Sequence, residues 1–293
     1  MKIRYNPSTN LFEDSSEDTV LPQVMWHITD KCHLNCKTCF AKKTNGFGGD
    51  ISIDQARKNI KYLKQLGVQK IDISGGEPLL YEPLSLFVME LIENGFYVTI
   101  TTRGIGLEEN YEWLENHWHL FSRVIVSLDG GSDRVCDYYA SFENTMKYAM
   151  GLCADLRRKG CNNLRINTVV NRIIMQTDNM KELSERISEI VPKEWCLIQP
   201  HPLNKKIEYD NFAVDRDMYL RFCSSVVKNW HDNKTQIIFR DNSLYSTYWT
   251  LQNENTIVHL SDGEEYDYVA ILSSETIDCI KNYISQCAQK IPM

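Results

Sequence analysis

The sequence predicts an α/β fold, a partial (β/α)6 TIM-like barrel with a C-terminal extension. Six short β-rich runs alternate with five amphipathic helical runs, an order that favours parallel strands joined by crossover helices. Residues suited to ligand contact follow the β-rich runs directly, and barrels of this kind contact their ligands at the carboxyl ends of their strands. Since closure requires eight such units, six of them predict an open barrel.

Each expected element has its own pattern. The expected strands are rich in β-branched and other apolar residues, and they cover residues 24–28, 70–74, 97–102, 123–127, 164–170 and 195–199. The expected helices repeat apolar residues every three or four positions, and they cover residues 52–66, 84–93, 107–117, 142–158 and 179–190. Beyond residue 200 we expect an amphipathic helix at 219–230, a hairpin that joins 246–251 to 256–260, and a closing helix at 276–286.

These elements divide the chain into three expected parts. Residues 1–22 are polar, with an acidic run, and are expected to form a solvated N-terminal lead-in. Residues 23–200 are expected to form the barrel core. Residues 201–293 are expected to form a C-terminal extension that completes the barrel and covers the active site.

The composition and charge of the chain are those of a globular protein, with 43% apolar and 24% charged residues. The net charge of −7 argues against direct nucleic-acid binding, which requires a basic face. No apolar run approaches the ~20 residues of a membrane span, and the first residues lack the apolar core of a signal peptide. Most of the ten cysteines are scattered among apolar residues, which predicts buried thiols in a reducing compartment, most simply the cytoplasm.

Three cysteines lie within eight residues, directly after the first expected strand: Cys32, Cys36 and Cys39, spaced Cys-x3-Cys-x2-Cys. This spacing lets three thiolates converge on one metal centre. A structural zinc ion takes four ligands and the usual cubane iron–sulfur cluster has four thiolates, so three thiolates leave one position of a cubane open to a small molecule. A zinc site completed by His27 or His33 is the alternative interpretation.

The second expected strand ends in the turn Gly75-Gly76-Glu77-Pro78. Adjacent glycines and a proline are typical of a plain strand-ending turn, because glycine permits positive φ and proline stops further pairing. The alternative is that the glycines let the charged end of a ligand lie against the backbone, while Glu77 accepts a hydrogen bond from its ammonium group. The position of the turn, at the end of the strand that follows the cysteine loop, favours ligand binding.

Together with Phe40, the cysteine and glycine motifs resemble those of the radical S-adenosylmethionine (SAM) superfamily. The resemblance implies a [4Fe–4S] cluster on the three cysteines, whose open iron is chelated by the amino and carboxylate groups of SAM. It implies that a low-potential donor such as flavodoxin or ferredoxin supplies an electron, and that SAM is cleaved to a 5′-deoxyadenosyl radical. Ser127 is expected to meet the methionyl carboxylate or the ribose, and Arg172 to pair with the carboxylate. The full set of expected cofactor-binding residues is Phe40, Gly75, Gly76, Glu77, Thr101, Ser127, Asn167 and Arg172.

A narrower resemblance, over about residues 24–200, is to the viperins, the antiviral branch of this superfamily. The matching segments are residues 25–29, 70–80, 166–172, 195–199 and, more faintly, 246–251. It implies a nucleoside triphosphate substrate that loses water to give a 3′-deoxy-3′,4′-didehydro nucleotide, which terminates viral RNA synthesis. Tyr248 is expected to return a hydrogen atom or an electron. The residues expected at the substrate are His27, Lys42, Lys43, Asn45, Arg103, Arg165 and Lys205.

Departures from the viperin pattern keep other interpretations open. Residues 138–145 are neither basic nor glycine-rich where viperins carry a phosphate-binding stretch, and Thr102-Arg103-Gly104 replaces an Asn-Gly-Ser turn. The membrane-binding N-terminal helix of animal viperins is not found, so prokaryotic viperin-like proteins are the expected relatives. The alternative enzyme is a single-cluster radical SAM maturase of a ribosomal peptide or another small substrate. A zinc- or cluster-bearing binding module is the non-enzyme alternative.

Overall fold

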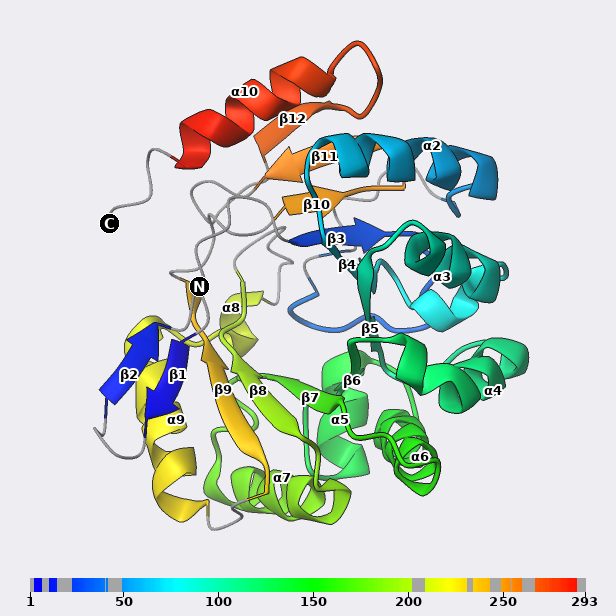
Figure 1. The fold of residues 1–293 in the computed structure, drawn as a ribbon. Helices are drawn as coiled ribbons and strands as arrows, with labels where there is room; N and C mark the ends of the chain where they lie inside the picture. The colour runs from blue at the N-terminus through cyan, green and yellow to red at the C-terminus, as the bar shows by residue number, and fades with distance from the viewer. Residues whose placement is uncertain are drawn as a thin grey trace.

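A row of parallel strands forms the centre of the protein in the computed structural model (Figure 1). The structure describes residues 3–6, 11–14, 23–39, 41, 49–201, 209–230, 234–242, 249–253, 255–259 and 267–288. Across these residues one twelve-stranded sheet has the order β12-β11-β10-β3-β4-β5-β6-β7-β8-β9-β1-β2. The strands from β10 to β9 in this order pair in parallel, and antiparallel pairs continue the sheet at both ends instead of closing it. The predicted open barrel is confirmed.

All six predicted strands are present. They are β3 (Gln23–His27), β4 (Lys70–Ser74), β5 (Tyr97–Thr102), β6 (Arg123–Ser127), β7 (Leu164–Val169) and β8 (Glu194–Ile198). A further parallel strand, β9 (Gln236–Arg240), pairs with β8 and is not among the predicted ones. Its apolar run is only three residues long, between Gln236 and Arg240, which makes it a weak strand signal.

Helices cover the outer face of the parallel strands (Figure 1). The predicted crossover helices are α2 (Ile53–Gln65), α3 (Leu84–Glu93), α4 (Glu108–His117), α6 (Thr145–Arg158) and α7 (Thr177–Ile190). Among the residues that the structure describes beyond β8, there are three helices: α8 (Tyr209–Phe212), α9 (Arg216–Asn229) and α10 (Ile277–Ala288). The last two confirm the helices predicted at 219–230 and 276–286.

The prediction of one helix from residue 142 to 158 is wrong at its start, because the segment after β6 contains two helices. Helix α5 (Asp133–Ala140) comes first and buries Tyr139. Ser141 and Asn144 then adopt left-handed backbone angles, with φ of 52° and 60°, and separate α5 from α6. Left-handed residues end helices, and serine and asparagine gave no strong signal for this break in the sequence.

Alternation along the strands separates an apolar outer face from a polar inner face. Trp26 of β3 is fully buried, and its ring meets that of Phe87 of α3 edge-on at 5.0 Å between centroids. Ile71 and Ile73 of β4 are fully buried in the same core, and Asp72 between them lies on the opposite face. Helices therefore cover one side of the parallel strands, and the other side carries charged residues.

Segments from both ends of the chain extend the sheet. Strands β1 (Ile3–Asn6) and β2 (Leu11–Asp14) pair antiparallel with each other, and β1 pairs with β9. The expected N-terminal lead-in therefore contributes two strands to the sheet in its described part. At the other edge β10 (Trp249–Leu251) pairs with β3, and β11 (Thr256–His259) and β12 (Asp267–Ile271) follow. The described part of the predicted hairpin is thus confirmed. Among the described residues no helix is long and apolar enough to span a membrane.

Candidate active site

The loop that carries the three cysteines follows β3 and is held by α5. The backbone N–H of Asn35 donates to the carbonyl of Ala140 at 2.8 Å, and that of Lys37 donates to the carbonyl of Tyr139 at 3.0 Å. The hydroxyl groups of Thr38 and Tyr139 also share a buried hydrogen bond. The carboxyl end of a helix has unpaired carbonyls to offer, and here they position the cysteine loop.

The same loop is anchored where it leaves β3. Thr29 donates a side-chain hydrogen bond of 2.6 Å to Asp50. Asp30 accepts hydrogen bonds from the backbone N–H of Gly49 at 3.0 Å and from the side chain of Asn253 at 2.9 Å. Asn253 lies in the turn between β10 and β11, so the C-terminal part of the chain contributes directly to the geometry of the cysteine loop.

The three cysteines are half-buried and form no disulfide. Burial raises the pKa of Cys36 to about 12, the charge of Arg103 opposes this shift, and Cys39 and Cys32 add to it. Cys36 therefore has both other thiols of the loop among its electrostatic neighbours. Three thiols in one half-buried loop are the donor set that a [4Fe–4S] cluster with one open iron requires, so these residues fit the cluster.

The zinc hypothesis receives no support from the described residues. They contain no group of three or more His, Cys, Asp or Glu side chains that could hold a single metal ion. His27, one of the two possible fourth ligands, is fully buried, its Nε2 lies 3.3 Å from Met25 Sδ, and burial lowers its pKa to about 4. A cubane cluster differs from a single ion because its thiolates bind separate irons.

The Gly75-Gly76 turn packs against the backbone of the cysteine loop. Gly76 N–H donates to Thr29 O at 2.7 Å, and Glu77 N–H donates to Lys31 O at 2.8 Å. A Cβ atom on Gly75, where φ is +136°, would lie 2.3 Å from Thr29 O, and a Cβ on Gly76 would lie 2.2 Å from Lys31 O. Glycine is required at both positions because of this close backbone approach.

Glu77 is a buried acceptor that joins the glycine turn to the end of β5. Its Oε1 accepts from Leu79 N–H at 3.2 Å and from the hydroxyl of Thr102, and its Oε2 accepts from Arg103 N–H at 2.9 Å. Burial raises the pKa of Glu77 to about 7, and these three donors oppose that shift. The side chain predicted to accept from a ligand's ammonium thus has three donors within the protein.

Arg103 directly follows β5 and is paired with Asp129. Both side chains are buried, and Asp129 also accepts from Val169 N–H at 2.8 Å. Burial alone would lower the pKa of Arg103, but the neighbouring Asp129, Cys36 and Cys136 raise it. The predicted substrate contact Arg103 therefore faces a carboxylate and thiol sulfurs.

Arg165 lies on the inner face of the barrel, near the beginning of β7. Its Nη2 and Nε lie 2.5 and 2.6 Å from Glu194 Oε2 at the start of β8. Arg123 joins the same carboxylate at 2.9 Å. Close by, Asp72 and Arg240 complete the inner ionic layer, which we define as Asp72, Arg123, Arg165, Glu194 and Arg240.

Within this layer, Asp72 is held by hydroxyl donors. Thr99 and Thr101 donate to its Oδ1 at 2.9 and 3.3 Å. Burial raises the pKa of Asp72, and the charges of Arg240 and Arg165 are among the influences that lower it. Burial likewise lowers the pKa of Arg240. Charged residues inside strands, such as Asp72 between two isoleucines and Glu194 before an apolar run, were the signal that the sequence offered for this layer.

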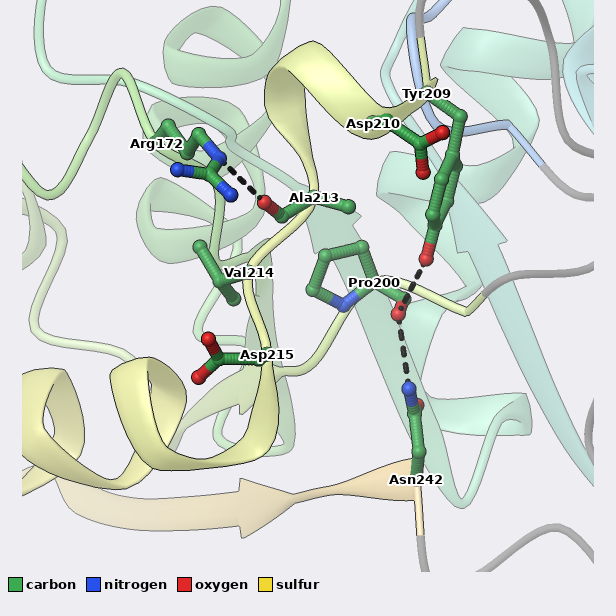
Figure 2. A pocket seen from close by; sticks show the side chains of 8 residues that line it. All are labelled: Arg172, Pro200, Tyr209, Asp210, Ala213, Val214, Asp215 and Asn242. Carbon is green, nitrogen blue, oxygen red and sulfur yellow. Dashed lines mark hydrogen bonds between the residues drawn. The ribbon is translucent and has the colours of Figure 1, made fainter.

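The remaining predicted residues are divided between the barrel and its rim. Ser127 and Asn167 are neighbours across β6 and β7, and the side-chain oxygen of Asn167 is buried with no hydrogen-bond partner among the described residues. Arg172 is exposed, and its Nε donates to Ala213 O at 2.8 Å in an open cavity of about 310 Å³ (Figure 2). Six predicted residues lie outside the described part of the chain: Phe40, Lys42, Lys43, Asn45, Lys205 and Tyr248.

Comparison with known proteins identifies the class to which this fold and site belong. A model of the Radical SAM superfamily matches residues 26–190, more than half of the chain. The chain therefore belongs to the radical SAM superfamily. This superfamily uses a [4Fe–4S] cluster and SAM, and these are the cofactors of the chain.

Among individual proteins, the chain is similar to several S-adenosylmethionine-dependent nucleotide dehydratases. It is 24% identical to that of Lacinutrix mariniflava over 72% of this chain and 45% of the relative. It is 25% identical to that of Fibrobacter sp. (strain UWH6) over 82% of this chain and 72% of the relative. For the first of these, and for a fish relative from Siniperca chuatsi of which 54% is covered, the match spans about half of the relative's length.

Solved structures share the fold. The crystal structure of Streptococcus suis SuiB bound to S-adenosylmethionine matches with a TM-score of 0.67 and 14% identity, over 89% of this chain and 65% of SuiB. The structure of anSMEcpe with bound AdoMet and the Cp18Cys peptide matches with a TM-score of 0.68 and 14% identity, over 89% of this chain and 81% of that one.

Proposed function

We propose that the chain is a viperin-like enzyme that dehydrates a nucleoside triphosphate to its 3′-deoxy-3′,4′-didehydro form in antiviral defence. The observation that carries this proposal is the extent of the match to the Fibrobacter nucleotide dehydratase, which runs over 258 residues. The family-wide core occupies only residues 26–190. The similarity to this nucleotide dehydratase therefore reaches beyond the residues that the superfamily model matches.

Cys32, Cys36 and Cys39 would hold the cluster. When bound, the cluster and SAM supply a 5′-deoxyadenosyl radical that can remove a hydrogen atom from the substrate. The glycine turn fixes the cysteine loop through the hydrogen bonds from Gly76 and Glu77. Ser127 and Asn167, adjacent across β6 and β7, are proposed to orient SAM, and the buried, unpartnered oxygen of Asn167 is suited to accept from it.

The charges of the inner ionic layer support an anionic substrate. This layer has three arginines, Arg123, Arg165 and Arg240, and two carboxylates, Asp72 and Glu194. It therefore has one positive charge in excess (3 − 2 = 1), which is too little for a triphosphate. We propose that the outer phosphates are bound nearer the mouth, by Lys42, Lys43 and Lys205 with Asn45, and that Tyr248 returns a hydrogen atom or an electron.

The proposed setting is the cytoplasm, with a flavodoxin or ferredoxin as electron donor. The proposal is tested by anaerobic incubation of the reconstituted enzyme with SAM, dithionite and each of the four ribonucleoside triphosphates in turn. We expect one of them to stimulate 5′-deoxyadenosine formation and to yield a product lighter by one water. Equal, unstimulated 5′-deoxyadenosine formation with all four would contradict the nucleotide proposal.

A second candidate is a single-cluster maturase of a ribosomal peptide. It is favoured by the ion pairs of Arg103 and Arg165 with Asp129 and Glu194, because cations that are already paired contribute less to triphosphate binding. A short peptide encoded beside the gene would be its substrate. Mass spectrometry of that peptide after incubation with the enzyme and SAM tests this candidate, for which a loss of hydrogen or a new cross-link is the expected result.

A further inference from the structure

The ion pair between Arg103 and Asp129 lies just beyond the carboxyl ends of β5 and β6. Side-chain exposure is 6% for Arg103 and 4% for Asp129. Both residues are fixed independently of each other, because Arg103 N–H donates to Glu77 at 2.9 Å and Asp129 accepts from Val169 N–H at 2.8 Å.

The guanidinium of Arg103 is only partly satisfied. Its Nη2 is paired with Asp129, but its Nη1 is buried with no hydrogen-bond partner among the described residues. A buried cationic donor without a partner is costly, so such a group is expected to have an acceptor in the working protein.

Besides Asp129, the charged or ionisable groups near Arg103 include two thiols, those of Cys36 and Cys136. Arg103 acts electrostatically on the thiols of Cys36 and Cys136. Cys136 is buried in α5, with its Sγ 3.3 Å from Gly130 O. Cys36 lies in the loop that α5 holds and packs against a small buried cluster of Leu34, Ile105 and Ala140. Ile105 in this cluster is two residues beyond Arg103. When the cluster is bound, Cys36 is a thiolate and inorganic sulfides lie beside it.

We propose that the buried Arg103–Asp129 pair sets the electron affinity of the cluster, with Arg103 Nη1 donating a hydrogen bond to a cluster sulfur. Reduction adds one electron from a low-potential donor to the cluster, [4Fe–4S]²⁺ + e⁻ → [4Fe–4S]⁺. Positive charge and hydrogen bonds to sulfur stabilise the reduced form, and negative charge opposes it. Arg103 therefore raises the midpoint potential and Asp129 lowers it.

The test is an anaerobic redox titration of the cluster in the full-length protein, without SAM or substrate. Electron paramagnetic resonance (EPR) measures the reduced cluster at each potential. Arg103→Gln removes the charge but retains a donor for Asp129. At the wild-type midpoint we expect the ratio of reduced to oxidised cluster to be about tenfold lower in the variant than in the wild type, a shift of about −59 mV for one electron. Asp129→Asn, which still accepts from Val169 N–H, is expected to shift the midpoint in the positive direction.

Arg57→Gln is the matched control, because it removes the same charge from an ion pair with Glu90 at 2.8 Å on the outer helices. It is expected to change the reduced fraction by less than about twofold, because solvent and salt screen an exposed charge that is far from the cluster.

Two results would overturn the proposal. In the first, Arg103→Gln and Asp129→Asn both have the midpoint potential of the Arg57→Gln control. In the second, the midpoints of Arg103→Gln and Asp129→Asn move in the same direction. If Arg103→Gln does not retain the cluster, Asp129→Asn decides alone: a positive shift supports the proposal, and no shift or a negative one overturns it. The proposal depends on the cluster alone, so it does not fail if the nucleotide proposal fails.

Discussion

The side chain of Asn253 donates a hydrogen bond of 2.9 Å to Asp30, at the start of the cysteine loop, although the two residues are 223 positions apart in the chain. The same amide group lies 2.6 Å from Gly49 O, so it joins both ends of the loop region. The C-terminal hairpin is therefore part of the structure that positions the cysteine loop, and not only an edge of the sheet.

We expect Asn253→Ala to loosen the cysteine loop. The variant loses a hydrogen bond to a carboxylate, a contribution of about 1.5–3 kcal/mol. The variant should lose its cluster to an iron chelator faster than the wild type does. The decay of the visible absorption of the cluster measures this rate. Asn229→Ala is the control, since the Asn229 amide donates an exposed hydrogen bond to Ser225 O at the end of α9. Equal rates for the two variants would show that Asn253 does not restrain the loop.

Gly76→Ala is expected to disrupt the contact between the glycine turn and the cysteine loop. The added Cβ would lie 2.2 Å from Lys31 O, so the backbone of one segment must move. Iron content and the thermal midpoint should both fall.

The control for this substitution is Gly151→Ala in α6. There the nearest atom would lie 4.0 Å from the new Cβ, and alanine is favoured in a helix by about 1 kcal/mol. We expect it to keep its iron and to melt no lower than the wild type. If Gly76→Ala binds as much iron as Gly151→Ala does, the close approach of Gly76 to the backbone of Lys31 is contradicted.

Each of Cys32, Cys36 and Cys39 is expected to be required for the cluster. Replacement of any one by alanine should remove the brown chromophore and abolish 5′-deoxyadenosine formation under dithionite. Cys279→Ala is the control, because this cysteine is exposed on α10. Normal turnover in one of the three loop variants would refute that residue as a ligand.

Glu77 should make stability depend on pH. Its pKa is raised by burial to about 7 from an ordinary value of 4.5, so the folded protein retains a proton that the unfolded chain loses between these pH values. Stability therefore falls as pH rises from about 4.5 to 7, and the loss is constant above that range. The effect is on the order of 3 kcal/mol.

The thermal midpoints of wild type and Glu77→Gln, compared at pH 5 and pH 8, measure this effect, because the other titrating groups are common to both proteins. The wild type should lose more stability than Glu77→Gln between the two pH values. If the difference in thermal midpoint between wild type and Glu77→Gln is the same at pH 5 and pH 8, Glu77 is already ionised in the folded protein at pH 5.

The strands and the cysteine and glycine motifs were predictable because local sequence determines them. The run Lys70–Ser74 is β4 without a change of boundary, and its end is the glycine turn. Helix α5 was not predictable, because its end depends on left-handed angles at Ser141 and Asn144 that these residues only tolerate.

The partners of the charged residues were not predictable either. Arg165 lies 29 positions from Glu194 and Arg103 lies 26 from Asp129, and these distances are closed only by the sheet. The sequence motifs also gave no sign that the glycine turn is filled by the backbone of Thr29 and Lys31.

The most direct test of the account is EPR spectroscopy of the anaerobically reconstituted, dithionite-reduced protein before and after SAM is added. The account predicts four irons and four sulfides per chain, with a [4Fe–4S]⁺ signal that SAM alters, because one iron is open to it. A stoichiometric zinc ion without iron, or a cluster signal that SAM leaves unchanged, would contradict it.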